Sequence, residues 1–261
     1  MIKRSGGSRR PVPPLFWFFL FLIIWEAAAR TGFVSNLVLP TVSSVISGLF
    51  TAPADGHLIL SIGISLVYVF SGMAAGSAAA FVLASAAFRF KPVNSLFQML
   101  SAVFHPLPGI ALLPVLILFF GIGPVSLLMV IIHSVLWPLA VNLAAGFTAV
   151  PAVYRKIGAN YSLSSASFFF RIMLPASFPY ILAGMKTAWA RAWRAVVSAE
   201  MIFGITGDRG GLGWFIYSRR IFMDTRGMYA GLLAIAVLGL FIESFLFDGI
   251  ELFTIRKWEG V

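Results

Sequence analysis

The chain has 261 residues, of which 60% are hydrophobic and only 11% are charged. This composition excludes an ordinary soluble globular domain and predicts an all-α, polytopic membrane helix bundle of about six spans. The formal net charge is +10, but the basic residues lie in short segments beside apolar stretches, so we interpret them as topology signals and expect no nucleic-acid partner. The chain has no cysteine, which excludes disulfide scaffolds and thiolate metal sites.

The amino-terminal region predicts a short cytoplasmic tail, residues 1–12, followed by a first span at about 13–31. No small-residue cleavage site ends the apolar stretch, so we expect an uncleaved span and not a signal peptide. Glu26 and Arg30 have i,i+4 spacing at its far end, where we expect a snorkelling ion pair.

A Pro- and Ser-rich connection with one amphipathic helix from Thr41 leads to a second span at about 58–86. Gly72, Gly76 and Ala80 recur along this span, and such small residues allow another helix to approach closely. The basic loop that follows should lie on the cytoplasmic side.

A proline-rich third span is predicted at about 94–121. Pro106, Pro108 and Pro114 remove backbone donors, so they should kink or interrupt the helix. Membranes tolerate such interruptions only where protein or a water-filled cavity covers the freed groups, so these prolines and His105 are candidate residues of a solute pathway. A kinked packing helix remains the alternative.

The fourth span, at about 125–146, leads into a mixed serine and phenylalanine segment at residues 150–175. This segment is too polar to span a bilayer and too apolar to remain free in water, so we expect it to bind a protein partner on the cytoplasmic side. An amphipathic interfacial loop is the alternative. Pro175 and Pro179 should stop the short helix and redirect the chain into the fifth span at about 178–203.

Residues 172–186, IMLPASFPYILAGMK, resemble the second half of the EAA loop in permease subunits of binding-protein-dependent, ATP-driven importers. Residues 189–200, WARAWRAVVSAE, look like the nitrate, sulfonate, taurine and bicarbonate branch of that family, and residues 104–123 are similar to another of its signatures.

The first half of the loop departs from the family pattern. The family's Glu-Ala-Ala falls on Lys156, Ile157 and Gly158, and its turn glycine falls on Ser162. Without that glycine we expect Ser162 to adopt another turn geometry or to cap the following helix. The resemblance implies an ATPase-docking loop whose candidate residues are Lys156, Ile157, Gly158, Ser162, Ser165, Phe168, Phe169, Leu174 and Pro175. Of these, Phe169 is the residue that we expect to abolish docking when it is charged.

The resemblance also implies the partners of the chain. It implies two copies of a cytoplasmic ATP-binding subunit that uses ATP and Mg²⁺, a second copy of the permease, and an extracytoplasmic solute-binding protein. It implies no catalytic residue, metal or cofactor in this chain, and a small anion as cargo. The expected location is the inner membrane of a prokaryote.

Four charged residues interrupt the fifth span: Lys186, Arg191, Arg194 and Glu200. A charge near the bilayer centre costs about 2.5 to 3.5 kcal/mol on insertion scales, so such residues face a pore, a partner or an interface. Lys186 is near enough to the cytoplasmic end to snorkel. Arg191 and Arg194 share a face, and Glu200 lies on roughly the opposite side. We expect the two arginines and Glu200 to be pathway candidates, with Arg191 or Arg194 paired to an acid on another helix or copy.

A Gly-rich segment at residues 204–213 precedes the sixth span, at about 228–249, and a cytoplasmic tail, residues 251–261. An even number of spans puts both termini on the same side of the membrane, and the positive-inside rule makes that side the cytoplasm because most of the basic residues fall there. The excess of arginine in the last outer loop indicates either an acidic partner, attraction of an anion, or tolerated surface charge.

No enzyme class has a matching constellation. His57, His105 and His133 are isolated, and neither a zinc-binding HExxH motif nor a GxSxG nucleophile motif occurs. We interpret the histidines as hydrogen-bonded structural or pathway residues. An ion-coupled secondary carrier is the alternative function; it would show inverted repeats and intramembrane ion ligands, and neither is evident.

Overall fold

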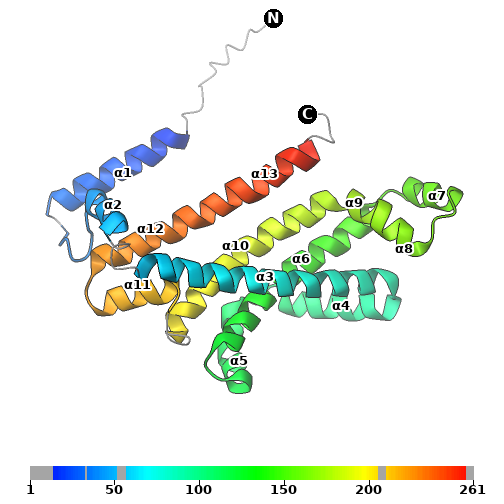
Figure 1. Cartoon of the computed structure of the whole chain (residues 1–261), viewed down its shortest axis with the longest axis horizontal. Helices are drawn as coiled ribbons and strands as arrows, with labels where there is room; N and C mark the ends of the chain where they lie inside the picture. Colours follow the sequence, from blue (N-terminus) through cyan, green and yellow to red (C-terminus); the bar gives the residue numbers. More distant parts are fainter. Residues whose placement is uncertain (1–13, 33, 52–56, 205–209, 257–261) are drawn as a thin grey trace, which may run out of the picture.

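The computed structural model describes residues 14–32, 34–51, 57–204 and 210–256, and every regular element in these ranges is helical. This confirms the predicted all-α class (Figure 1). The main helices are α1 (Pro14–Arg30), α2 (Val42–Thr51), α3 (His57–Arg89), α4 (Lys91–Phe104), α5 (Leu113–Phe120), α6 (Pro124–Ala149), α10 (Phe178–Phe203), α11 (Leu212–Ile221) and α12 (Thr225–Ile242). Short elements complete the chain: η2 (Gly109–Leu112), α7 (Ala152–Asn160), α8 (Ser165–Phe168), η3 (Phe169–Met173), α9 (Leu174–Ala176), η4 (Glu243–Phe247), α13 (Asp248–Glu251) and η5 (Leu252–Arg256).

The centre of the bundle consists of α3, α6 and α10, and α6 is the most buried of the long helices. The predicted close approach along the second span is confirmed, because α3 lies directly on α6. A Cβ added at Gly72 would overlap Ile131, and one at Gly76 would come within 2.8 Å of the Cβ of Val135. Small residues therefore let these two backbones approach closely.

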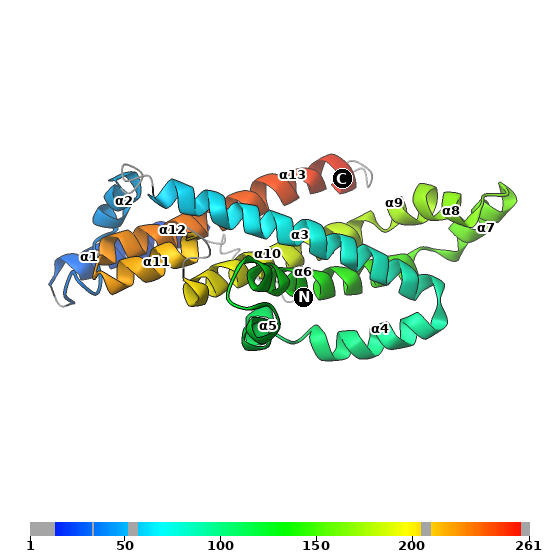
Figure 2. The ribbon, with the colours of Figure 1, turned by 60° about the horizontal axis from the view of Figure 1, so that its bottom comes forward.

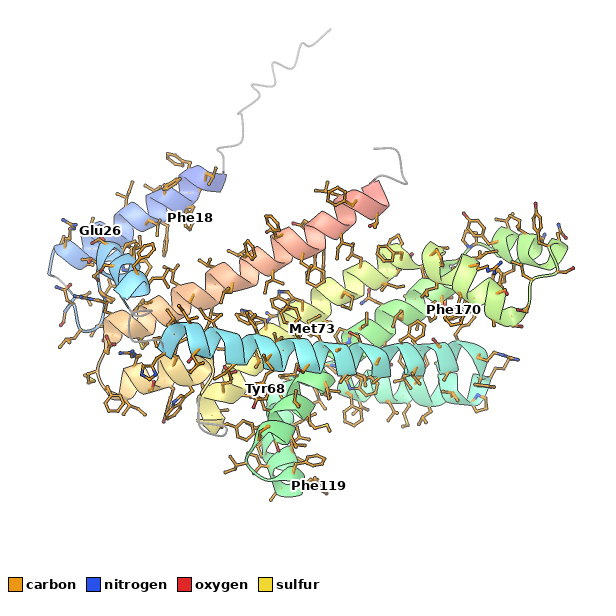
Figure 3. All side chains as sticks on the ribbon, in the orientation of Figure 1. Phe18, Glu26, Tyr68, Met73, Phe119 and Phe170 are labelled. Carbon is orange, nitrogen blue, oxygen red and sulfur yellow. The ribbon has the colours of Figure 1, made fainter. Side chains whose placement is uncertain are left out.

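The outer surface of the bundle is apolar. Large hydrophobic side chains are exposed along most helices, and Figure 3 shows two of them, Phe18 on α1 and Phe119 on α5, on the outside of the ribbon. Soluble monomers rarely expose contiguous apolar surface of this extent, whereas a surface facing lipid acyl chains must be apolar. Composition and surface together identify a membrane helix bundle.

Three of the described helices, α3, α6 and the helix that begins with α12, are long and apolar enough to cross a membrane. The number rises to five if each of two bent helix pairs is one span. One bent pair is α4 with η2 and α5, which meet at 92°, so the interruption predicted for the third span is present. The count of six spans and their boundaries stay predictions.

The outer connection after α1 is tied down by polar contacts. The predicted pair forms, with Arg30 Nε 2.7 Å from Glu26 Oε1. Glu26 also accepts hydrogen bonds from the backbone N–H and the hydroxyl of Ser43. The carboxylate therefore joins α1 to α2 in addition to pairing with Arg30 within α1. The expected tail at residues 1–12, residues 205–209 of the Gly-rich segment and residues 257–261 lie outside the described part of the chain.

Candidate functional site

The segment between α6 and α10 forms a hook, which we define as residues 151–176. It comprises α7, α8, η3 and α9, and it projects at one end of the bundle beyond α3 and α4 (Figure 2). Residues 165–176 meet α10 at an angle of 65°, which is the redirection expected at Pro175 and Pro179. The elements α1, α2 and α11 lie at the opposite end (Figure 1).

The turn of the hook departs from expectation at Ser162. This residue takes the left-handed conformation itself, with φ of 50°, and does not cap the next helix. Ser164 caps α8 instead, because its hydroxyl accepts a hydrogen bond from the N–H of Ser167 at 3.2 Å. Both expectations for Ser162 were therefore wrong: the turn keeps the backbone shape that suits glycine, at a cost of about 1 to 3 kcal/mol.

Several predicted docking residues face the bundle. The Phe168 ring packs on Gly158, where an added Cβ would be 2.6 Å from Cδ2 of the ring. The Phe169 ring contacts Phe81 of α3 and Phe147 of α6 edge-on, with centroids 6.0 and 5.4 Å away. Leu174 is also partly buried against the core. Charging Phe169 would therefore loosen the hook from the bundle, so it is the wrong residue for a docking test.

The solvent-facing side of the hook carries a different set of apolar residues. Val153, Ile157 and Tyr161 follow helical spacing along α7, and their neighbour Tyr154 is also exposed. Phe170 is 60% exposed, and Figure 3 shows its place near the end of the bundle. The predicted residues Lys156, Ser162, Ser165 and Pro175 are exposed as well. We call Val153, Tyr154, Ile157, Tyr161 and Phe170 the hook face; of these, only Ile157 was among the predicted docking residues.

A second feature is a pocket of about 280 Å³ at the break in the third span. The break at residues 104–110, two turns of α6 and the middle of α10 line it. It brings together five of the predicted pathway residues, His105, Pro106, Pro108, Arg191 and Arg194. The structure thus gathers residues that are about 85 positions apart in the sequence at one place.

Arg191 holds the break through its backbone. Its Nη1 donates a hydrogen bond of 3.0 Å to the carbonyl oxygen of His105, one of the groups that the interruption leaves free. Arg194 donates from Nε to the carbonyl of Ala190 in its own helix. Neither arginine has an ion pair with another described residue, so the expected pairing with an acid on another helix is not found there, and pairing with a second copy stays a prediction.

The pocket residues that were missed as candidates include His133, Trp137 and Ser198. Both ring nitrogens of His133 are buried without a hydrogen-bond partner among the described residues, as is Nδ1 of His105. The hydrogen bond expected of a structural histidine is therefore absent for His133 among the described residues, and the other interpretation, a pathway histidine, stays a prediction. The sequence signal was present, because a lone histidine within an apolar span is uncommon.

The remaining predicted pathway residues lie elsewhere. Pro114 is in the first turn of α5, where a backbone N–H would have no acceptor within the helix. Its missing N–H therefore costs nothing there, so Pro114 begins a helix and does not break one. Glu200 is fully buried on another side of α10 and accepts hydrogen bonds from Ser65 and from the N–H of Gly213.

Lys186 has two acidic partners near the end of the last helix, and its snorkelling to the cytoplasmic end stays a prediction. Its Nζ lies 2.9 Å from Oδ1 of Asp248 and also contacts Glu251, so it joins α10 to the end of the last helix. No group of three or more His, Asp or Glu residues that could hold a metal ion occurs in the described ranges.

Comparison with known proteins gives consistent matches over most of the chain. Residues 72–248 match the family described as binding-protein-dependent transport system inner membrane component. The chain is 27% identical over 250 residues to the nitrate import permease protein NrtB of Synechocystis, covering 92% of this chain and 88% of that protein. It is 26% identical over 234 residues to the taurine transport system permease protein TauC of Escherichia coli, covering 86% and 82% of the two chains. It is also 26% identical over 243 residues to the putative aliphatic sulfonates transport permease protein SsuC of Bacillus subtilis, covering 93% and 85%.

Proposed function

The chain belongs to the family of inner-membrane components of binding-protein-dependent transport systems, and we propose that, with a second copy, it forms the solute route of an ATP-driven importer. The family match over residues 72–248 carries this proposal, because it includes both the hook and the pocket. The relatives are import permeases, which favours this function over an ion-coupled carrier.

The hook is the part of the chain suited to bind the ATP-binding subunit and to transmit its movement to the helices. Two copies of a cytoplasmic ATP-binding subunit, which use ATP and Mg²⁺, would each bind one hook face. The exposed aromatic and aliphatic side chains of the hook face fit a groove on a protein, since interface cores are rich in such residues. The hook continues into α10, and Phe169 attaches it to α3 and α6, so a displaced hook would move the three central helices together.

The cargo is a small anion of the nitrate, sulfonate, taurine or bicarbonate class. The names of the relatives support the first three, and the two arginines of the pocket support negative charge. An extracytoplasmic binding protein would deliver the solute to the end of the bundle opposite the hook. In this arrangement the chain lies in the inner membrane of a prokaryote, with both termini and the hook in the cytoplasm.

The experiment that tests this function is co-purification of the tagged chain with ATPase subunits from native membranes. We expect the wild-type chain to co-purify with an ATPase and the Phe170→Asp variant not to do so. The new aspartate would be buried in an apolar interface without a partner for its charge. Phe222→Asp is the matched control, since Phe222 is also an exposed phenylalanine but follows α11 at the other end of the bundle. This control should retain the complex.

Two results would overturn the proposal. If no ATPase accompanies the wild-type chain, the energy source is wrong and the ion-coupled carrier becomes the better explanation. If Phe170→Asp and Phe222→Asp retain the complex equally, docking takes place elsewhere than on the hook face.

A further inference from the structure

We propose that the pocket at the break in the third span is an internal binding site for one small oxyanion, with Arg191, Arg194 and His133 as its ligands. The inference rests on the proposed function only in taking the bound anion to be the transported solute. Binding itself is a property of this chain, and nothing in the comparisons assigns a solute site to these residues.

The charge of the pocket favours an anion. Arg191 and Arg194 line it, and no aspartate or glutamate of the described part of the chain does. Arg191 is 13 residues after the first residue of α10, which puts it roughly 20 Å along the helix, well within the hydrocarbon thickness of about 30 Å. Two cations at that depth without a paired acid require a compensating group, and ionisable residues so placed mark solute pathways.

The pocket also has hydrogen-bond donors that the described residues do not use. The guanidinium of Arg191 has five N–H groups, and the bond to the His105 carbonyl is its only one among the described residues. Both ring nitrogens of His133 are buried and have no hydrogen-bond partner in the part of the chain that the structure describes. Buried polar groups are nearly always paired, so an oxyanion, whose charged oxygens are strong hydrogen-bond acceptors, is a suitable partner for an N–H of each.

The walls of the pocket limit the size of the solute and strengthen its binding. Phe104 and Trp137 stack on one side, with ring centroids 5.4 Å apart, and Gly109 fits so closely against α6 that a Cβ there would be 2.8 Å from the carbonyl oxygen of Val130. A volume of about 280 Å³ is just below the range of about 300 to 1,000 Å³ for ligand pockets, so it suits a solute of a few heavy atoms. Apolar walls lower the local dielectric, which strengthens the attraction between arginine and anion.

The test uses the histidines as reporters, because the chain has only three of them. The full chain with ¹⁵N-labelled histidine is reconstituted in lipid, and the ring nitrogen signals are followed by solid-state NMR. Sodium nitrate, bicarbonate and ethanesulfonate are titrated at constant ionic strength in a gluconate background, with ethylammonium as the matched cation. A His133→Asn variant assigns the His133 signal.

We expect at least one anion to shift the His133 signal saturably, while His57, at the start of α3 and outside the pocket, stays unchanged. Arg191→Gln should weaken binding at least tenfold. Because this variant also loses the bond to the His105 carbonyl, Arg194→Gln tests the charge independently and should weaken binding at least threefold. Arg220→Gln removes the same charge at the exposed end of α11 and should change binding less than twofold.

A His133 signal that responds equally to ethylammonium, or that none of the three anions shifts, overturns the site. Equal affinities in wild type, Arg191→Gln and Arg194→Gln do the same. This failure is separate from failure of the importer function. A chain that binds an ATPase but no anion contradicts only the site, and a chain that binds the anion but no ATPase contradicts only the energy source.

Discussion

Glu200 shows how one buried carboxylate can join three parts of this chain. Both of its oxygens lie 2.8 Å from the hydroxyl oxygen of Ser65, and the N–H of Gly213 donates to Oε2 at 2.9 Å. The Ser65 hydroxyl also accepts from the N–H of Leu212. The carboxylate therefore connects α10 to α3 and to the first turn of α11, and it forms no ion pair with another residue in the described ranges.

We predict that Glu200→Ala lowers the stability of the bundle, because it leaves the Gly213 N–H and the Ser65 hydroxyl without an acceptor. Each unsatisfied buried donor costs about 1 to 3 kcal/mol. Glu200→Gln should lower the stability much less than Glu200→Ala, because the amide oxygen of glutamine can still accept a hydrogen bond from the Gly213 N–H. The midpoint of thermal unfolding of the purified chain in detergent measures both.

Glu243→Ala is the control for that experiment, because Glu243 is exposed near the end of the last helix. It should leave the midpoint of unfolding nearly unchanged. A Glu200→Ala variant as stable as this control would show that the buried carboxylate adds nothing to stability.

At the residue scale, the sequence predicted which residues belong to the site better than it predicted the partners that they contact. It singled out Arg191 and Arg194 because charges in an apolar span are expensive, and both line the pocket. It assigned them an acidic partner, whereas Arg191 bonds to a carbonyl freed by the proline-rich break. At Ser162 the sequence favoured another turn geometry because the residue is not glycine, whereas the backbone there is left-handed with φ of 50°.

At the scale of elements, the contact between α3 and α6 depends on glycines that have no room for a side chain. A Cβ at Gly76 would lie 2.8 Å from the Cβ of Val135 and 3.1 Å from the carbonyl oxygen of Ile132, and the carbonyl belongs to the backbone of α6. Any larger residue at this position must push the two helices apart. The pattern of small residues was readable in the sequence because this packing recurs in membrane helices.

Gly76→Leu should therefore destabilise the bundle by about 1 to 3 kcal/mol or prevent its folding, as overpacked cores do. Gly63→Leu is the matched control on the same helix, since an added Cβ there meets nothing within 4 Å. The yield of monodisperse protein and the midpoint of thermal unfolding report the difference. Equal behaviour of the two variants would contradict tight packing at Gly76.

At the scale of the whole molecule, the hook and the outer connection lie at opposite ends of the bundle (Figures 1 and 2). The basic residues predict which end is cytoplasmic, because positive charge is retained on that side. The absence of cysteine makes this orientation directly measurable, since any single introduced cysteine is the only thiol.

We predict that an impermeant maleimide labels Ser35→Cys in intact spheroplasts and Ser165→Cys only in inverted vesicles. Both serines are exposed, and they lie in the outer connection and the hook respectively. Permeabilised membranes, in which both cysteines should react, provide the control for accessibility. Labelling of Ser165→Cys from outside would reverse the topology.

The sequence by itself determined the helical class, the membrane environment and the family. These depend on local quantities: the length of apolar runs, the residues within a motif and the spacing of small side chains. Only the tertiary structure decided that Phe169 faces the bundle while Phe170 faces outward, and that His133 joins Arg191 and Arg194 around one pocket. Those facts depend on the rotation of each helix about its axis and on the geometry of the break, which are set by packing between segments distant in the chain.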